Sequence, residues 1–183
     1  MNRFASKVMF VAGLSFATAT VFAQGDLTAE QKAKVDAKIK EVTVWGTDSL
    51  VVADVKAANT TPPALNKEMT QEKWKALTAV SPEVRGLLKS PVGLWCKAHK
   101  TEVVSELFVS AADGTKVGFT SKTSNWSHKG KPKHDVPMTG KTWIGESEQD
   151  ASTGKAQVQV SFPVLDGTKA IGSIVIGLDL SKL

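Results

Sequence analysis

Lysines and histidines gather in one polar segment between residues 115 and 141. The segment contains Lys116, Lys122, Lys129, Lys131, Lys133 and Lys141, together with His128 and His134, and its one acidic residue is Asp135. Ammonium groups that converge on a cleft attract anions, so one interpretation is a binding site for an anionic ligand such as a small carboxylate. The other is a solvated loop, which suits the three lysines from 129 to 133 best, because Gly130 and Pro132 space them as an exposed turn.

Two tryptophans flank this segment. Trp126 and Trp143 could line an apolar pocket or stack on a ligand ring, or they could anchor the loop to the rest of the protein. Lys122, Lys141 and His128 lie nearer to predicted strands and to aromatic residues, and they are the basic residues that we expect to contact a ligand.

Metal and haem chemistry find little support. Cys96 and His99 could hold a metal ion on one helical turn, with His128 and His134 as further ligands. However, the paired spacings of zinc modules and the Cys-x-x-Cys-His motif of covalent haem are missing from the sequence. We expect no metal and no cofactor, and the flanking Leu94 and Trp95 favour burial of Cys96 as a small hydrophobic residue over a reactive thiol.

Catalytic constellations are also missing. No serine lies in a Gly-x-Ser-x-Gly elbow, and the family resemblance given below implies that Glu146, Glu148 and Asp150 lie in a surface turn. The sequence therefore indicates a protein that is not an enzyme.

The first 23 residues predict a cleaved signal peptide. Arg3 and Lys7 precede an apolar stretch from Val8, and Val21-Phe22-Ala23 is a plausible cleavage signal. The stretch is shorter than the ~20 apolar residues of a membrane span, so an uncleaved anchor is the weaker alternative. We expect a periplasmic protein. Its net charge of +5 falls to +3 when the signal peptide with Arg3 and Lys7 is removed, because 21 basic and 18 acidic residues remain. So modest a charge argues against binding to nucleic acid.

The remaining residues, 24–183, are expected to form one domain of ordinary globular composition, with 42% hydrophobic and 22% charged residues in the whole chain. Residues 24–59 predict a long amphipathic helix that begins at a Thr28/Gln31 capping box. It either runs unbroken or bends at Gly46. Residues 60–100 predict short helices that start near Thr70, at Ser81-Pro82 and at Ser90-Pro91.

Residues 101–183 predict an antiparallel sheet with a long crossing loop. The sequences VVSELFV and TKVGFT flank an Asp113-Gly114 turn, and AQVQVSFPVL and KAIGSIVIGLDL flank Asp166-Gly167, so each pair predicts a hairpin. The polar segment 121–154 connects the hairpins. The order of elements is typical of an α+β domain.

The segments SELFVSAADGTKVGFTSKTSNW and TWIGESEQDASTGKAQVQVSFPVLDGTKAIGSIVIGLDLSKL resemble periplasmic sensor domains of the Cache type, PAS-like modules also called PDC sensors. The resemblance implies a five-stranded antiparallel sheet with the long helix packed behind it. It also implies a small-molecule pocket between the other face of the sheet and the crossing loop. It brings Asn125 and Trp126 near that pocket, together with the polar strand face at Gln157, Gln159 and Ser161, although the sequence does not fix which face of the strand turns inward. It also matches Asp179 to a family position, with a structural or ligand-facing role.

The resemblance implies a periplasmic small-molecule-binding sensor domain without an output domain of its own. It would pass ligand occupancy to a membrane receptor or histidine kinase, and the long N-terminal helix could support a homodimer. The alternative is an adaptor or inhibitor that docks on a protein or an anionic envelope surface and has no small ligand. A protein that carries metal or haem is a weaker third hypothesis.

Overall fold

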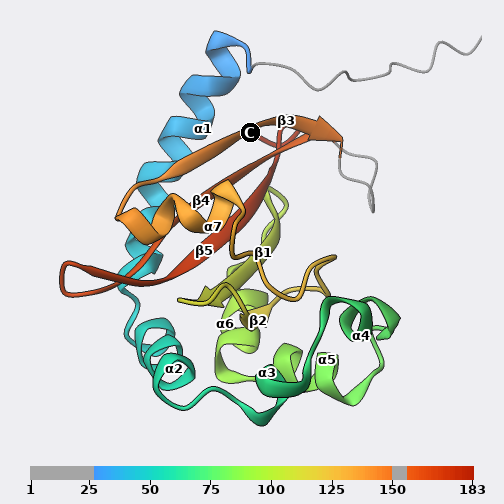
Figure 1. Cartoon of the computed structure of the whole chain (residues 1–183). Helices are drawn as coiled ribbons and strands as arrows, with labels where there is room; N and C mark the ends of the chain where they lie inside the picture. Colours follow the sequence, from blue (N-terminus) through green and yellow to red (C-terminus); the bar gives the residue numbers. More distant parts are fainter. Residues whose placement is uncertain (1–26, 150–155) are drawn as a thin grey trace, which may run out of the picture.

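A five-stranded antiparallel sheet forms the centre of the computed structural model, which describes residues 27–149 and 156–183. The strands are β1 (Val104–Ala111), β2 (Lys116–Phe119), β3 (Trp143–Gln149), β4 (Ala156–Asp166) and β5 (Lys169–Asp179). They lie in the order β2-β1-β5-β4-β3 (Figure 1). The PAS-like α+β fold is confirmed. The expected signal peptide at 1–23, Asp150 and the end of the crossing loop at 151–154 lie outside the described residues.

Both predicted hairpins form. The Asp113-Gly114 turn joins β1 to β2, and the Asp166-Gly167 turn joins β4 to β5. Gly114 and Gly167 adopt φ angles of +80° and +62°, a region that residues with a Cβ atom rarely enter. The edge strand β3 lies inside the segment that the residue pattern assigned to the crossing loop. Only the family resemblance implied a fifth strand.

Helices precede the sheet in the chain and return once within the crossing loop. They are α1 (Ala29–Val42), the 3-10 turn η1 (Thr43–Thr47), α2 (Ser49–Thr60), α3 (Ala64–Glu68), α4 (Gln71–Ala76), α5 (Pro82–Lys89), α6 (Pro91–His99), α7 (Pro132–Asp135) and the 3-10 turn η2 (Pro137–Thr139). The helix starts predicted at Thr70, Ser81 and Ser90 are confirmed.

The long N-terminal helix is divided at Gly46, so an unbroken helix over residues 24–59 is wrong and the bend is confirmed. The backbone passes through η1 and restarts at α2, where Asp48 caps the helix by accepting from the backbone N–H of Leu50. A Cβ atom on Gly46 would lie 2.2 Å from the carbonyl oxygen of Pro163 in β4. Backbone contact with the sheet therefore determines where the helix bends.

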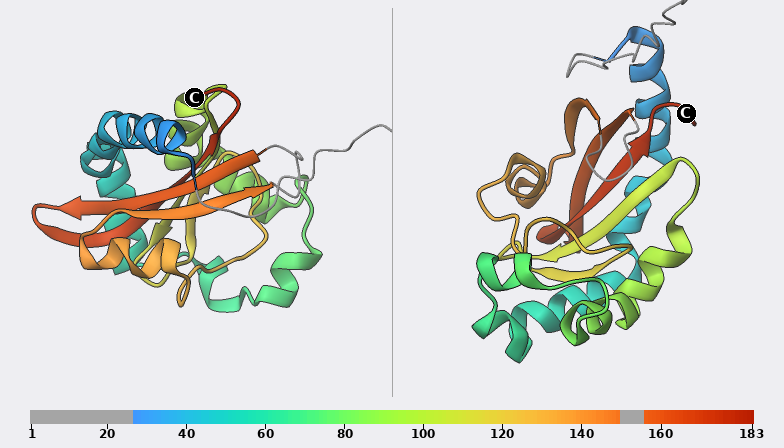
Figure 2. Two further views of the ribbon diagram at one scale, coloured as in Figure 1. Left: turned by 90° about the horizontal axis from the view of Figure 1, so that it is seen from above. Right: turned by 90° about the vertical axis from the view of Figure 1, so that its right-hand side faces the viewer.

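One face of the sheet packs against α1, α2 and α6. Its core consists of Val35, Val42, Val51, Val55, Val92, Trp95 and Cys96 from the helices and of alternate apolar residues of β1, β4 and β5. Both views in Figure 2 show α1 and α7 on opposite sides of the sheet. Val35 and Val42 of α1 are buried in this core, and Ile39 packs against it. The homodimer through this helix stays a prediction, and it would have to use the exposed side of α1, which carries its charged residues and alanines.

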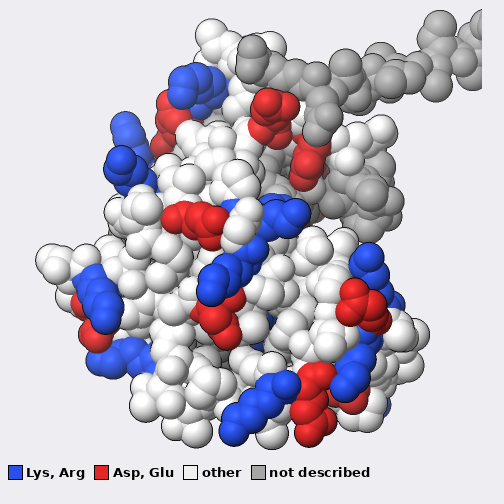
Figure 3. Space-filling model, in the orientation of Figure 1, with Lys and Arg blue, Asp and Glu red and all other residues white. Residues whose placement is uncertain are grey.

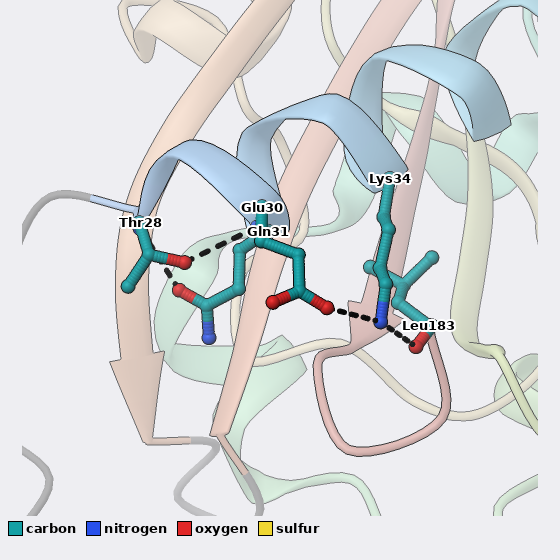
Figure 4. Close-up of polar contacts among 5 residues, drawn as sticks. All are labelled: Thr28, Glu30, Gln31, Lys34 and Leu183. Carbon is teal, nitrogen blue, oxygen red and sulfur yellow. Dashed lines mark hydrogen bonds and ion pairs between the residues drawn. The ribbon is translucent and has the colours of Figure 1, made fainter.

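The capping box of α1 is also confirmed (Figure 4). Thr28 Oγ1 accepts from the backbone N–H of Gln31 at 3.2 Å, and Gln31 Oε1 accepts from the backbone N–H of Thr28 at 3.0 Å. One turn further on, Lys34 Nζ pairs with Glu30 at 3.2 Å and donates to the carbonyl oxygen of Leu183 at 3.0 Å. Nowhere along residues 27–149 and 156–183 does a helix combine the length and apolar character needed to cross a bilayer.

The other face of the sheet meets the crossing loop. Because Val158, Val160 and Phe162 face the helices, Gln157, Gln159 and Ser161 face the loop, which settles a direction that the sequence left open. Three rows of paired residues run across this face: Gln157 with Asp179 and Glu148, then Glu106 with Gly177 and Gln159, then Phe108 with Val175, Ser161 and Trp143.

Candidate functional site

A cavity of about 360 Å³ lies beside strands β3 and β4 on the loop side of the sheet. It is lined by Lys133, Trp143, Ile144, Gly145, Glu146, Glu148 and Gln159. Except for Lys133, these residues come from the edge strand β3 and its neighbour β4. The cavity therefore forms where α7 lies over the sheet.

The short helix α7 delivers Lys133 to this cavity. Pro132 occupies the first helical turn, where its fixed φ angle suits a helix start, and the next two residues turn toward the sheet. Lys133 Nζ donates to Gln159 Oε1, and Gln159 Nε2 donates to Glu106 Oε2 at 3.0 Å. The second bond spans Gly177, whose lack of a side chain leaves room for it.

Charges of both signs meet at the cavity. Burial lowers the pKa of Lys133, and the carboxylates of Glu106 and Glu148 act in the opposite direction. Lys133 forms no ion pair within 4 Å with any described residue. Its nearest polar contact is a neutral amide, so a ligand carboxylate can compete for the ammonium group.

The floor next to the cavity contains a buried hydroxyl group. Ser161 is fully buried and lies opposite Trp143 in the strand pairing. Its Oγ has no hydrogen-bond partner among the described residues. An unsatisfied buried hydroxyl costs free energy.

A second polar cluster lies deeper on the same face. Lys116 is 2% exposed, and its Nζ contacts His128 Nδ1 and Ser110 Oγ, the latter at 3.2 Å. The His128 ring stacks on Phe108, with centroids 4.9 Å apart. Burial lowers the pKa of Lys116 well below its usual value. Burial, followed by the charge of Lys116, lowers the pKa of His128 to about 2.

His134 holds α7 against the centre of the sheet. Its Nε2 lies 3.2 Å from the carbonyl oxygen of Ala112 and its Nδ1 lies 2.8 Å from Ser173 Oγ. Since a carbonyl only accepts, Nε2 carries the proton and Nδ1 accepts from Ser173. Burial lowers the pKa of His134 as well. The adjacent residues Lys133 and His134 thus attach α7 to β4 and β5.

The structure brings together part of the predicted site. Trp143 lines the cavity, Ser161 lies beside it, and His128 contacts the Phe108 end of the same row. Lys141 is exposed, and Asn125 uses its backbone carbonyl to accept from Thr123 Oγ1 at 2.8 Å. Whether any of these residues binds a ligand stays a prediction.

Trp126 and Lys122 lie against Trp74, away from the cavity, and Asp179 lies in the row of Gln157 and Glu148 without lining the cavity. Trp126 is 5% exposed, and the centroid of its ring lies 5.0 Å from that of Trp74. Lys122 Nζ also lies 5.0 Å from the centroid of the Trp74 ring. Asp179 Oδ1 accepts from the backbone N–H and the hydroxyl of Ser181, at 2.9 and 2.6 Å. These contacts give the three residues packing roles, in addition to any contact with a ligand.

Three residues of the cavity differ from what the sequence predicted. Lys133 was expected on an exposed turn with its neighbours, and Glu146 and Glu148 on a surface turn, yet all three line the cavity. Lys129 and Lys131 are exposed as expected. The available signal was Pro132: proline at the first helical position starts a turn of helix, which directs the following side chains inward.

The residues considered for a metal site are separated by the sheet. Cys96 lies in the helix-side core, where burial raises the pKa of its thiol, and His99 stacks on Trp95 at 4.1 Å. His128 and His134 lie on the loop side. Among the residues that the structure describes, no three His, Cys, Asp or Glu side chains are grouped closely enough to hold a metal ion. The predicted burial of Cys96 is confirmed.

Comparisons with protein-family models and with curated proteins give no match. Among solved structures, the chain is similar to the sensor domain of the Vibrio cholerae histidine kinase DctB, at 10% identity and a TM-score of 0.48 over 83% of this chain and 53% of that one. It is also similar to the ligand-binding domain of the Campylobacter jejuni chemoreceptor Tlp3 with L-valine, at 12% identity and a TM-score of 0.40 over 81% of this chain and 62% of that one.

A third similar structure is the ligand-binding domain of the Pseudomonas aeruginosa amino acid chemoreceptor PctC with GABA, at 14% identity and a TM-score of 0.37 over 81% of this chain and 62% of that one. The chain therefore spans between half and two thirds of the length of these structures. All three are sensor or ligand-binding domains, the group that the sequence resembles.

Proposed function

We propose that the protein is a small-molecule-binding sensor domain whose ligand occupies the cavity between α7 and the strands β3 and β4. The observation that supports this most directly is the meeting of Lys133, Glu148 and the Trp143 ring at one cavity on the loop side of the sheet. Concave sites with an aromatic wall and a few converging polar groups are typical of ligand-binding sites.

The charges of the cavity favour a dipolar ligand. A lone carboxylate would gain Lys133 but would also face Glu146 and Glu148, which line the same cavity. A molecule with both a carboxylate and an ammonium group, such as an amino acid, can pair with Lys133 and Glu148 at once. The simple anionic carboxylate expected from the loop lysines is therefore the weaker candidate, since Lys129 and Lys131 are exposed.

The same geometry offers a route by which ligand binding could be reported. Lys133 is held by Gln159 on one strand while the adjacent His134 is held by Ser173 on another. A ligand carboxylate that takes Lys133 from Gln159 would loosen one of these two attachments of α7. We infer a shift of α7 that a membrane receptor or histidine kinase in the periplasm recognises.

Docking on an anionic surface without a small ligand receives less support. On the face that carries α7, basic and acidic side chains are interspersed (Figure 3). Mixed charges of this kind do not build the one-signed field that favours binding to an anionic envelope.

A thermal-shift screen of the purified protein against amino acids, amines and small carboxylates tests the proposal. A ligand at one hundred times its Kd should stabilise the protein by about 2.7 kcal/mol. Lys133→Met is expected to abolish the shift produced by the best amino acid, because it removes the cation of the cavity. Lys131→Met, an exposed lysine two residues away, is the matched control and should respond as wild type.

A panel without any shift would contradict the proposal and favour the docking protein. A shift that survives Lys133→Met would place the ligand somewhere other than this cavity.

A further inference from the structure

A second cavity lies on the opposite side of β3. It measures about 380 Å³ and lies between α1 and β3, with the lining residues Leu27, Lys32, Val35, Asp36, Ile144, Gly145 and Glu146. Ile144, Gly145 and Glu146 also line the first cavity. The two cavities thus share one short stretch of strand, on either side of the sheet plane.

The shared stretch belongs to an edge strand. Within the described residues, β4 is the one strand paired with β3, which leaves the outer N–H and C=O groups of β3 facing away from the sheet. Gly145 has no side chain to cover this edge, and a Cβ atom there would come within 2.8 Å of the Trp143 ring. Backbone groups of this kind accept an extended chain as an added strand.

The two cavities differ in chemistry. The first contains Lys133 and Glu148 beside the Trp143 ring. The second has an aliphatic wall of Leu27, Val35 and Ile144, and the charged residues Lys32, Asp36 and Glu146 complete its lining; it is called the aliphatic cavity below. Successive side chains of an extended chain point to opposite sides. A peptide along the edge of β3 would therefore direct alternate side chains into the polar cavity and the aliphatic cavity.

We propose that the ligand is a short extended peptide that lies along the edge of β3, with an aliphatic side chain between α1 and β3 and charged groups at Lys133 and Glu148. This inference rests on the proposed function, because it extends the ligand of the first cavity into the second. It specifies a ligand of a few residues in place of a single amino acid.

The geometry of β3 limits the length of the peptide. The pairing of β3 with β4 is irregular between Ile144 and Ser147, so a bulge interrupts the strand beside Gly145. Bulges disrupt continuous pairing with a further strand and protect edges from other proteins. A second copy of this chain would also bring its own Glu146 and Glu148 against the same residues. Both features favour a short peptide over a strand of a folded partner.

Isothermal titration with three probes tests the inference: the tripeptide Lys-Leu-Lys, the tripeptide Lys-Asp-Lys, and free lysine. The lysine side chains can meet Glu148 and the neighbouring Glu146, and the C-terminal carboxylate can meet Lys133, while leucine enters the aliphatic cavity. Lys-Leu-Lys should bind at least about tenfold more tightly than either other probe, as burial of one aliphatic side chain predicts.

A variant separates the second cavity from the first. Leu27→Ser removes an aliphatic residue that lines only the second cavity, and it should weaken Lys-Leu-Lys by about fivefold while leaving free lysine unchanged. Leu94→Ser, at a leucine that is 55% exposed on α6, is the matched control. Thermal melts without ligand confirm that both variants are folded.

The outcomes distinguish this inference from the proposed function. If free amino acids bind and no tripeptide binds more tightly, the inference is overturned and the proposed function stands. Equal binding of Lys-Leu-Lys to wild type and Leu27→Ser also overturns it. If neither tripeptides nor amino acids bind, both fail. A dimer in sedimentation that Ile144→Lys dissociates, without peptide binding, would assign the edge to a second copy.

Discussion

Lys116 and His128 contact each other through nitrogen atoms in a part of the sheet face that excludes water. Both pKa values are lowered, mainly by burial, and His134 follows the same direction. Each group is therefore more easily protonated in the unfolded chain than in the folded protein. The free energy of unfolding must rise with pH wherever the unfolded chain binds the extra proton.

For His128 and His134, the pH range in which the unfolded chain binds the extra protons lies below 6.5, their ordinary pKa. As the pH falls from 6.5, the unfolded chain takes up protons that the folded protein refuses, and stability decreases. We expect urea unfolding to give a lower free energy of unfolding at pH 5 than at pH 7. Equal values at the two pH values would contradict the burial of neutral histidines.

For Lys116, the range extends up to 10.5, its ordinary pKa. Stability should rise between pH 7 and 9.5 by up to about 1.4 kcal/mol per pH unit, the value for one proton. Lys116→Met keeps the volume and removes the titrating group, so the variant should lose this rise. Lys129→Met, at an exposed lysine, serves as the control and should keep it. Parallel pH profiles for all three proteins would rule out a neutral Lys116.

Residue by residue, the sequence predicted burial better than contact. Cys96 could be assigned to the core because its neighbours are apolar. Lys133 could not be distinguished from Lys131, because charge and spacing are the same for both. The difference arises from one turn of helix after Pro132 and from Gln159, which lies 26 residues away in the chain.

At the scale of elements, the junction between α1 and α2 depends on close backbone contact. The side-chain-free Gly46 lies against β4, where a Cβ atom would overlap the carbonyl oxygen of Pro163. We expect Gly46→Ala to lower the free energy of unfolding by about 1 to 3 kcal/mol, since a packed backbone has to move. Guanidinium unfolding of the purified variant measures this loss.

The chain offers a matched control in another helix. Gly86 lies inside α5 and a Cβ atom there would meet nothing within 4 Å. Gly86→Ala should therefore raise stability by up to about 1 kcal/mol through helix propensity. If both substitutions change stability alike, contact with β4 is not what divides the long helix.

Elements with local signals were predicted from the sequence, and those with distant causes were not. The Asp-Gly turns, the capping box at Thr28 and the Ser-Pro helix starts each depend on neighbouring residues, and they are confirmed. The bend at Gly46 depends on β4, so the sequence left two alternatives open. The strand β3 is polar on both sides, with the sequence WIGESEQ, and carries no apolar alternation that would reveal it.

At the scale of the whole molecule, strand order assembles the candidate site. Glu106 and Gln159 belong to strands that are not adjacent, and β5 separates them with Gly177. No spacing in the sequence indicates that these residues meet. The resemblance to Cache domains provided the five strands and the loop-side pocket, whereas the charge pattern of the cavity required the strand pairing.

The bond between Lys34 and Leu183 has a consequence for connectivity. Leu27 lies just before the N-cap of α1, seven residues from Lys34, which is about 10 Å at the rise of a helix. A linker of eight Gly and Ser residues, with a root-mean-square span of roughly 16 Å, can therefore join Leu183 to Leu27. New ends can open at the exposed Gly167 turn. We expect this circularly permuted chain to form the same sheet, although its strands follow one another in a different order. Circular dichroism and thermal melting test this expectation. In the rearranged chain β5 is synthesised before β4, so its folding shows whether the pairing of the two strands depends on the order of their synthesis.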